Sequence, residues 1–526
     1  MPEIKEIVAT PRSGSTEESC MQKTSPEIKS SADHHTAGLT VNQEVETLTF
    51  YPFAYALVDS ELANYCWYCL DEPNIDSGLK RCAGCKVAYF CGKMCQKIGW
   101  IDHKPECKGL AAFVSQSKSI PDIEVRMLGR IVSRAKLIDD GKDSDPKFYI
   151  NRSSNRKILD IWSHTDAMRK DPRAWAKFCS IFDRLTQFYP ADAIYSDRDN
   201  IFELHCRNYI NRHAISNRAY TDEIGKGLYL DMCAYDHSCR PNTIYTCNGY
   251  IATLRPLNLN VSIRDRERTF YTYIDLLAAK GERRATLAES WYFKCDCERC
   301  LDESEHSLTA LSCRSNPTST EHQSVKCCGP VYIHGPKTRM PLACDTCGSV
   351  LPETLATQGL NARRDVEYWL NDERFAEERS AKSTLAFLRD LLKKFKPIFH
   401  ECNIWFVRLL QQAIIYTDRV EPTNYSALAE YHIAAVPCMR ICYPANHPAL
   451  AYHLMNCGIF SLKTAQSPVE NLESTVKLEL VTRAKNYLNE AGEMIRFTLG
   501  EDHQMSIQVQ GELKIASEME SELSSK

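Results

Sequence analysis

Four cysteines from two distant segments of the chain constrain its fold more than any other feature. Cys239 lies in the polar segment 235–242 (YDHSCRPN), and the other three lie in the later cluster 295–300 (CDCERC). Four thiolates are enough for one closed tetrahedral zinc site. Such a metal would fix two distant segments together, and it would hold Tyr273, in the segment 272–275 (TYID) between them, near the same place.

A second group of metal-ligand residues lies closer to the N-terminus and indicates two more zinc sites. The group contains eight candidate ligands: Cys66, Cys69, Cys82, Cys85, Cys91, Cys95, His103 and Cys107. Short Cys-x2-Cys turns let both sulfurs reach one ion. The x3 spacings at 91–95 and 103–107 place two ligands on one face of a short helix. The segment 66–107 therefore predicts a finger that binds two zinc ions.

The segment 301–350 contains further cysteines that could form another metal site. Cys344-x2-Cys347 is half a zinc knuckle, and Cys313 with either Cys327 or Cys328 could complete it. The Cys327-x-Gly step favours Cys327 as the ligand. The alternative is that some of these thiols are free.

The order of these motifs resembles that of a known enzyme family. His-Ser-Cys-x-Pro-Asn, then Tyr-Ile-Asp, then Cys-x-Cys-x-x-Cys is similar to a SET domain with its post-SET segment. The cysteine-rich finger narrows the resemblance to the SMYD family, in which a MYND finger interrupts the SET domain. The resemblance covers about residues 40–300 and, more loosely, the rest of the chain. It implies an S-adenosylmethionine-dependent protein lysine N-methyltransferase that acts on histone or non-histone proteins.

The resemblance also implies roles for individual residues. Tyr273 would be catalytic and contact the cofactor, the backbone of Asp236 and His237 would contact the adenine, and Phe293 would pack on it. The alternative for Tyr273 is a core tyrosine on an apolar strand, and His237 is expected to be a structural histidine rather than a base. The family pairs the finger ligands as Cys66, Cys69, Cys91 and Cys95 for one zinc, and Cys82, Cys85, His103 and Cys107 for the other; Cys239, Cys295, Cys297 and Cys300 would bind the post-SET zinc.

Several residues depart from the family pattern. Thr36 and Ala37 lie where the family has a Gly-x-Gly-Leu turn, Asp236 replaces an asparagine, and Trp291 replaces a tyrosine that lines the lysine channel. A side chain at Thr36 removes the conformational freedom of glycine. These departures motivate an alternative function: a catalytically weak or inactive SET–MYND protein that acts as a protein-interaction or transcriptional regulatory module.

The resemblance and the hydrophobic pattern together predict an α+β protein with a β-rich, interrupted SET domain and a helical C-terminal domain. Apolar residues at Leu388, Leu391 and Leu392 recur at helical spacing, and the family has a TPR-like helical array in this part. We expect strands over 39–59, and strands and turns over 201–230. The expected parts are a disordered tail (1–38), an N-terminal SET piece (39–65), the finger (66–107), a helical SET insertion (108–195), the core SET region (196–280), a post-SET zinc segment (281–350) and the helical domain (351–526).

Composition limits the partners and the compartment. The 25 cysteines occur at metal-like spacings and no secretory signal is found, which favours a reducing compartment, the nucleus and cytoplasm. The net charge of −4 argues against DNA as a partner, and no apolar run is long enough for a transmembrane helix. The expected partners are a protein substrate with a target lysine and peptide ligands of the finger.

Overall fold

The computed structural model describes residues 45–525, except for 74–77, 117, 144–147, 149–153, 196, 221, 314–326, 334–337, 340 and 372–378. The described residues belong to one compact unit. The predicted tail (1–38) and the turn with Thr36 and Ala37 lie outside the described residues. Of the helices in these ranges, none combines the length and the apolar character needed to cross a membrane.

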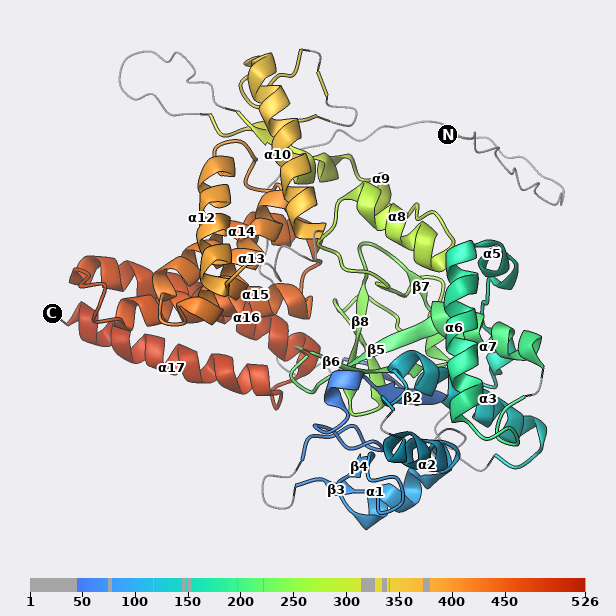
Figure 1. Ribbon diagram of the computed structural model, residues 1–526. Helices are drawn as coiled ribbons and strands as arrows, with labels where there is room; N and C mark the ends of the chain where they lie inside the picture. The colour runs from blue at the N-terminus through green and yellow to red at the C-terminus, as the bar shows by residue number, and fades with distance from the viewer. Residues whose placement is uncertain are drawn as a thin grey trace, which may run out of the picture. The chain divides into compact units, whose positions relative to one another are not determined.

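Two small antiparallel sheets bring together segments from distant parts of the chain (Figure 1). The first has the order β2-β6-β5, and its strands are Ala54–Leu57, Glu223–Leu228 and Arg212–Ser216. The second has the order β1-β9-β8, with strands Leu48–Phe50, Ile251–Pro256 and Thr243–Asn248. Within the described part of the range 39–59, the expected strands are present as β1 and β2, whereas residues 39–44 lie outside the described residues.

A short parallel pair lies next to the segment around Cys239. β7 (Asp236–His237) pairs with β10 (Phe270–Tyr271). Two further hydrogen bonds extend this contact: the Ser238 amide donates to the Tyr271 carbonyl, and the Asn242 amide donates to the Phe270 carbonyl. Tyr273 follows β10 in a bend, so the expectation that it lies on a strand is wrong.

The predicted finger is a short hairpin followed by two helices. Its elements are β3 (Lys80–Arg81), β4 (Tyr89–Phe90), α1 (Lys93–Ile98) and α2 (Trp100–Ser115). The expectation that Cys91 and Cys95 share one helix face is wrong, because α1 begins at Lys93 and Cys91 precedes it.

A group of helices follows the finger, and the first of them, α3 (Ile123–Asp139), packs against β2 of the first sheet. The group also contains α5 (Thr165–Lys170), α6 (Pro172–Phe188) and α7 (Arg198–Asn211). The expectation of strands and turns over 201–230 is therefore wrong for residues 201–211. The side chain of Asp197 accepts a hydrogen bond from the Asp199 amide, which is the capping interaction that starts α7.

Three buried arginines join α3 to the segment that contains β2. Arg126, Arg130 and Arg134 donate hydrogen bonds of 2.8, 2.6 and 2.5 Å to alternate carbonyls, those of Leu57, Tyr55 and Phe53. Four residues of helix advance about 6 Å and two residues of strand about 6.6 Å, so the two spacings match. This ladder of hydrogen bonds fixes the position of the helix along the strand.

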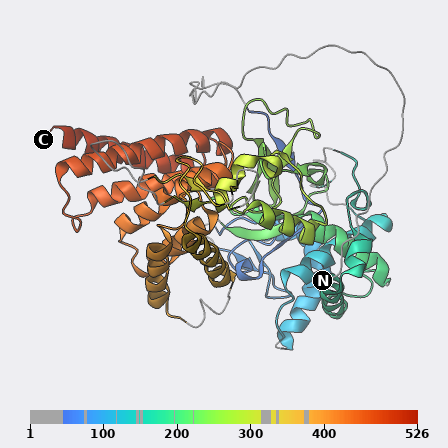
Figure 2. The ribbon, with the colours of Figure 1, turned by 90° about the horizontal axis from the view of Figure 1, so that it is seen from above.

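The C-terminal part is helical, as expected, and its consecutive helices pack side by side (Figures 1 and 2). The helices are α10 (Glu353–Asn371), α12 (Ala381–Phe395), α13 (Ile404–Val420), α14 (Tyr425–Cys442), α15 (Pro448–Gln466), α16 (Ser474–Leu499) and α17 (Gln504–Ser524). The TPR-like repeat stays a prediction. Along the chain, α8 (Lys280–Trp291), α9 (Glu298–Leu301), β11 (Leu311–Ser312) and β12 (Pro330–Val331) lie between the strands of the two sheets and this array. Short 3-10 turns of the described residues are at Asp59–Glu61, Ile158–Asp160, Met232–Ala234 and Glu303–Thr309.

Glu106 links the finger to α3 and is completely buried. Its carboxylate accepts from Arg130 at 2.5 Å, from the Tyr189 hydroxyl at 3.2 Å, and faces His103 Nδ1 at 3.4 Å. Burial alone would raise the pKa of Glu106, but the charge of Arg130 overcomes this and lowers the pKa to about 2. The carboxylate is therefore ionised inside the protein and balances the arginine.

We expect Glu106→Ala to lower the free energy of unfolding by about 3–5 kcal/mol, because it leaves the Arg130 charge buried and unpaired. Denaturant unfolding followed by circular dichroism measures the change. The control Glu267→Ala removes an exposed carboxylate and should stay within about 0.5 kcal/mol of wild type. Equal losses in the two variants would contradict this assignment.

Candidate active site and metal centres

Four groups of cysteine and histidine ligands converge in the described residues. Within each group, all ligand atoms lie within 4.8 Å of one another. A tetrahedron with Zn–S bonds of about 2.3 Å has sulfur–sulfur distances of about 3.8 Å. The observed distances include 3.9 Å between Cys82 and Cys107 and 3.7 Å between Cys239 and Cys300. The donor sets and their spacing therefore fit zinc.

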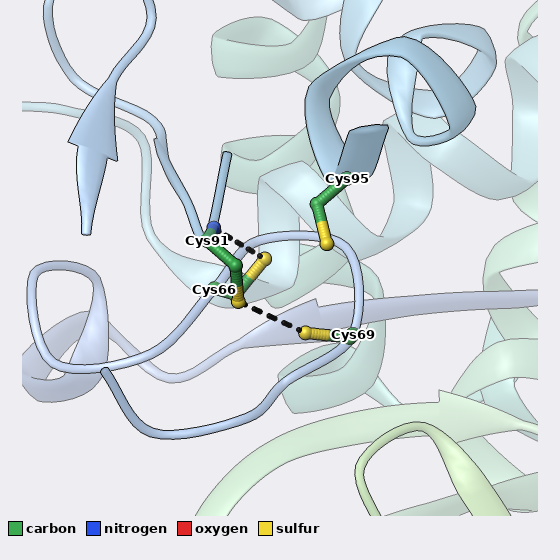
Figure 3. Close-up of side chains that lie close together, drawn as sticks. All are labelled: Cys66, Cys69, Cys91 and Cys95. Atoms are coloured by element: carbon green, nitrogen blue, oxygen red, sulfur yellow. Dashed lines mark hydrogen bonds between the residues drawn. The ribbon is translucent and has the colours of Figure 1, made fainter. Parts of the chain in front are cut away.

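The finger ligands form the two groups that the family resemblance implies. Cys66, Cys69, Cys91 and Cys95 direct their sulfurs toward one another (Figure 3), with 3.5 Å between the sulfurs of Cys69 and Cys91. Cys82, Cys85, His103 and Cys107 form the other group. His103 directs Nε2 toward Cys85, at 3.6 Å, and Nδ1 toward the carboxylate of Glu106. A carboxylate that accepts a hydrogen bond from the second ring nitrogen orients a metal-binding imidazole.

The third group joins Cys239 to the cluster that follows α8. Besides its contact with Cys300, the Cys239 sulfur lies 4.0 Å from that of Cys295, and the Cys239 amide donates to the Cys297 sulfur at 3.3 Å. Arg283 is completely buried, and its guanidinium lies 3.8 Å from the Cys300 sulfur. The structure thus brings together the four cysteines from two distant segments and places a positive charge beside the thiolates.

His237 connects this third group to Tyr273. The Tyr273 amide donates to His237 Nδ1 at 3.1 Å, and His237 Nε2 lies 3.2 Å from the Cys239 sulfur. Because Nδ1 accepts a hydrogen bond, the proton is on Nε2, which donates to the sulfur. Burial lowers the pKa of His237 to about 4, so the ring is neutral near pH 7. One imidazole therefore ties the Tyr273 backbone to the metal-binding loop.

The described residues that the sequence assigns to the cofactor and lysine pockets line one cavity of about 470 Å³. Asp236, His237, Tyr273, Trp291 and Phe293 all line it. The Tyr273 hydroxyl donates to the Tyr235 carbonyl at 2.8 Å, and burial raises the pKa of this phenol, which is therefore un-ionised at neutral pH. Trp291 Nε1 donates to the Ile210 carbonyl at 2.9 Å, which fixes the indole in the cavity wall.

A second cavity, of about 300 Å³, lies on the other side of Tyr273. Five residues line both cavities: Ala214, Tyr245, Tyr271, Thr272 and Tyr273. The charged residues that line the second cavity are Asp222 and Glu223. Tyr273 therefore stands in a largely aromatic wall between one cavity with the predicted cofactor residues and another with acidic character.

Sequence reasoning gave no role to most other residues that line the first cavity, among them Trp162, His164 and His213. Trp162 is 76% exposed, and its ring stacks on that of His164 at a centroid distance of 6.0 Å. His213 is buried on β5, and its Nε2 lies 2.7 Å from the Tyr271 hydroxyl. None of the three belongs to a local motif, so spacing along the chain gave no signal for them.

Comparison with known proteins gives the family. The MYND finger model matches residues 66–107. Human N-lysine methyltransferase SMYD2 is 29% identical over 251 residues, 47% of this chain and 53% of the relative. These matches support membership of the SMYD family. The zebrafish (Danio rerio) N-lysine methyltransferase SMYD2-B is 22% identical over 409 residues, 77% of this chain and 81% of the relative. Several alignments cover only about half the length of the relatives, as for the human protein.

The family membership expected from the motifs is thus confirmed. The mixed helix and strand content, the MYND finger and its cysteine clusters are those expected of a SMYD protein. The contact between His213 and Tyr271 could not be predicted from the spacing of residues along the chain.

His213 should make the stability of this SMYD-family chain depend on pH. Burial lowers the pKa of its imidazole to about 4, against about 6.5 in an unfolded chain. The unfolded state therefore binds the proton more tightly than the folded state. The stability that the neutral His213 contributes is complete above about pH 6.5 and is lost as the pH falls toward 4. At pH 5 the loss from this residue is about 2 kcal/mol relative to pH 7.5.

Urea unfolding at pH 7.5 and pH 5 measures this contribution. His213→Gln should show a smaller decrease in unfolding free energy between the two pH values than wild type, by about 2 kcal/mol. The control His306→Gln changes a partly exposed histidine and should keep the wild-type decrease. An unchanged pH dependence in His213→Gln would show that this residue does not carry the effect.

Proposed function

We propose that this chain is an S-adenosylmethionine-dependent protein lysine N-methyltransferase whose strands β1, β2 and β5–β10 form a SET domain interrupted by the finger and by helices α3–α7. Its relatives carry the name N-lysine methyltransferase, which supports methyl transfer to a protein lysine. The single observation that carries the proposal is the position of Tyr273 in the wall between two cavities. A reaction between a cofactor and a protein side chain needs two binding sites that meet at one point.

The first cavity fits the methyl donor. Its volume is in the range of small-molecule sites, and Phe293 supplies a flat apolar surface for an adenine. Asp236 and His237 also line this cavity, and the Asp236 carboxylate would attract a cationic ligand. When bound, S-adenosylmethionine would supply a methyl group on a positively charged sulfur.

The residues of the shared wall would prepare the lysine. An ammonium has no lone pair, so the lysine must first release a proton to water. Its nitrogen can then form a bond to the methyl carbon as the carbon–sulfur bond of the donor breaks, and the donor leaves as a neutral thioether. Removal of the amine from water lowers the pKa of a lysine, and Tyr245, Tyr271 and Tyr273 would provide such a channel. The Tyr273 hydroxyl, un-ionised and fixed by its bond to Tyr235, would orient the amine. Orientation of this kind contributes about 7–11 kcal/mol in well-ordered systems.

Tyr273→Phe should lower the rate of methyl transfer by about 100-fold, because the amine loses its orienting hydroxyl. Transfer of labelled methyl groups from S-adenosylmethionine to histones or to lysate proteins measures the rate. The control Tyr416→Phe changes a tyrosine of α13 outside both cavities and should leave the rate unchanged. Absence of label with the wild-type protein, or equal labelling by Tyr273→Phe, would refute the proposal.

The protein substrate would enter through the second cavity. Because the charged lining residues there are Asp222 and Glu223, we expect a target lysine with basic neighbours in the sequence. Glu223→Lys should raise the KM for such a peptide about tenfold and leave cofactor affinity unchanged. The control Glu267→Lys makes the same charge change at an exposed position outside this cavity. An equal KM in both variants would show that another surface binds the substrate.

A second candidate function follows from Trp291. Its ring lies 5.8 Å from that of Tyr273 and is held by a hydrogen bond, so a bulky side chain without a hydroxyl occupies the position where the family has a tyrosine. A protein with such a narrowed channel would act as a binding module through its finger and helices. Calorimetry with S-adenosylmethionine separates the two functions, because a binding module has no need of micromolar cofactor affinity. Peptide binding by the finger and a nuclear and cytoplasmic location stay predictions.

A further inference from the structure

The fourth cysteine group lies outside the three metal sites that the family resemblance implies. Its members are Cys313, Cys327, Cys344 and Cys347. The sulfurs of Cys313 and Cys347 are 3.6 Å apart, and those of Cys327 and Cys344 are 3.8 Å apart. Both distances are close to the value of about 3.8 Å expected for two thiolates on one tetrahedral zinc.

The backbone around these cysteines has the form of a metal knuckle. Cys344 and Cys347 flank a turn closed by a hydrogen bond of 3.0 Å from the Gly348 amide to the Cys344 carbonyl, and Gly348 has a φ of +72°, which glycine adopts without strain. The Gly329 amide donates to the Cys327 sulfur at 3.4 Å. An amide directed at a sulfur stabilises the thiolate form that binds metal.

The same geometry distinguishes two neighbouring cysteines. Cys327 directs its sulfur into the group, whereas Cys328 is exposed and does not belong to it. The Cys-x-Gly step that favours Cys327 in the sequence thus corresponds to the amide–sulfur contact from Gly329.

Regular strand pairing is sparse among the described residues of this part of the chain. β11 and β12 pair over only two residues each, and the other β-links there are isolated bridges, such as Val331 with Cys344. Strands this short are not stable alone in water. A structural zinc can supply the missing free energy, because metal binding to such segments is coupled to their folding.

The cysteine group is also packed against the helical array. The Ser312 amide donates to the Ile398 carbonyl at 2.9 Å, and Asn403 Nδ2 donates to the Ala310 carbonyl at 2.9 Å. Leu311 lies so close to α10 that a Cβ added at Gly359 would be 2.4 Å from its side chain. Metal ligands and helices therefore share one buried core, to which Cys313, Cys344, Val366, Phe395 and Trp405 belong.

We infer that Cys313, Cys327, Cys344 and Cys347 bind a fourth Zn²⁺ ion as four thiolates, and that this ion attaches β11, β12 and the turn at 344–347 to helices α10, α12 and α13. The inference is independent of methyl transfer. It concerns the attachment of the helical array and leaves the cavity around Tyr273 unaffected.

Zinc content of the purified full-length protein, measured by inductively coupled plasma mass spectrometry, tests the site. We expect four zinc ions per wild-type chain, three in Cys344→Ser/Cys347→Ser, and four in the control Cys328→Ser. Three ions in wild type, or four in the double variant, would overturn the inference. A lower content in Cys328→Ser would overturn the choice of Cys327.

A measurement on the wild-type chain keeps the test decisive if the double variant folds poorly, and a further measurement tests the attachment to the helices. Cobalt reconstitution of the wild-type chain should give thiolate-to-metal absorption that accounts for four cobalt ions, and saturation at three would overturn the site. Hydrogen exchange of the double variant should become at least tenfold faster in β11, β12 and α10 but not around Tyr273. Unchanged exchange in α10 after loss of one zinc would overturn the attachment.

Discussion

The organisation of the site depends on a buried group of four cysteines and on the positive charges that surround it. Four thiolates around one Zn²⁺ carry a net charge of −2, which is costly to bury unless cations lie close by. Arg283 lies beside Cys300, and Arg299 donates through Nη1 to the carbonyls of Cys239, Leu276 and Cys442. The carboxylate of Glu305 accepts from both arginines and holds them in place. Arg283 and Arg299 thus offset negative charge of the thiolates, and Arg299 also connects the segments of Cys239, Leu276 and Cys442.

This arrangement explains how elements far from Tyr273 position it. Leu276 follows Tyr273 by three residues, and Cys442 ends α14, so Arg299 ties the Tyr273 segment to both the metal loop and the helical array. His237 makes a second link, from the Cys239 sulfur to the Tyr273 amide. Because metal binding and folding are coupled, the free energy of zinc binding supports the geometry of the wall between the two cavities.

The sequence predicts what local spacing encodes and misses what tertiary packing decides. The metal groups could be predicted because Cys-x2-Cys turns are local and their chemistry is specific. The α7 segment was misjudged because its mixture of aromatic, β-branched and polar residues has no clear period, although Asp197 supplies a capping signal. The arginine ladder on α3 reads as a solvated charged face, and only the carbonyls of a distant strand show that Arg126, Arg130 and Arg134 are buried.

The backbone is strained at two residues in or next to the lining of the first cavity. His164 and Tyr292 are non-glycine residues with φ of 48° and 60°, a conformation that bulky side chains rarely adopt. Their rings lie 5.6 Å apart, and the ring of Trp162 stacks on that of His164. Backbone strain of about 1–3 kcal/mol per residue persists only where surrounding contacts impose it. Here those contacts join the helical insertion to the residue that ends α8. His164 and the two neighbours of Tyr292 in the chain, Trp291 and Phe293, line the cavity that we assign to the cofactor, so the strained backbone helps to hold its lining in place.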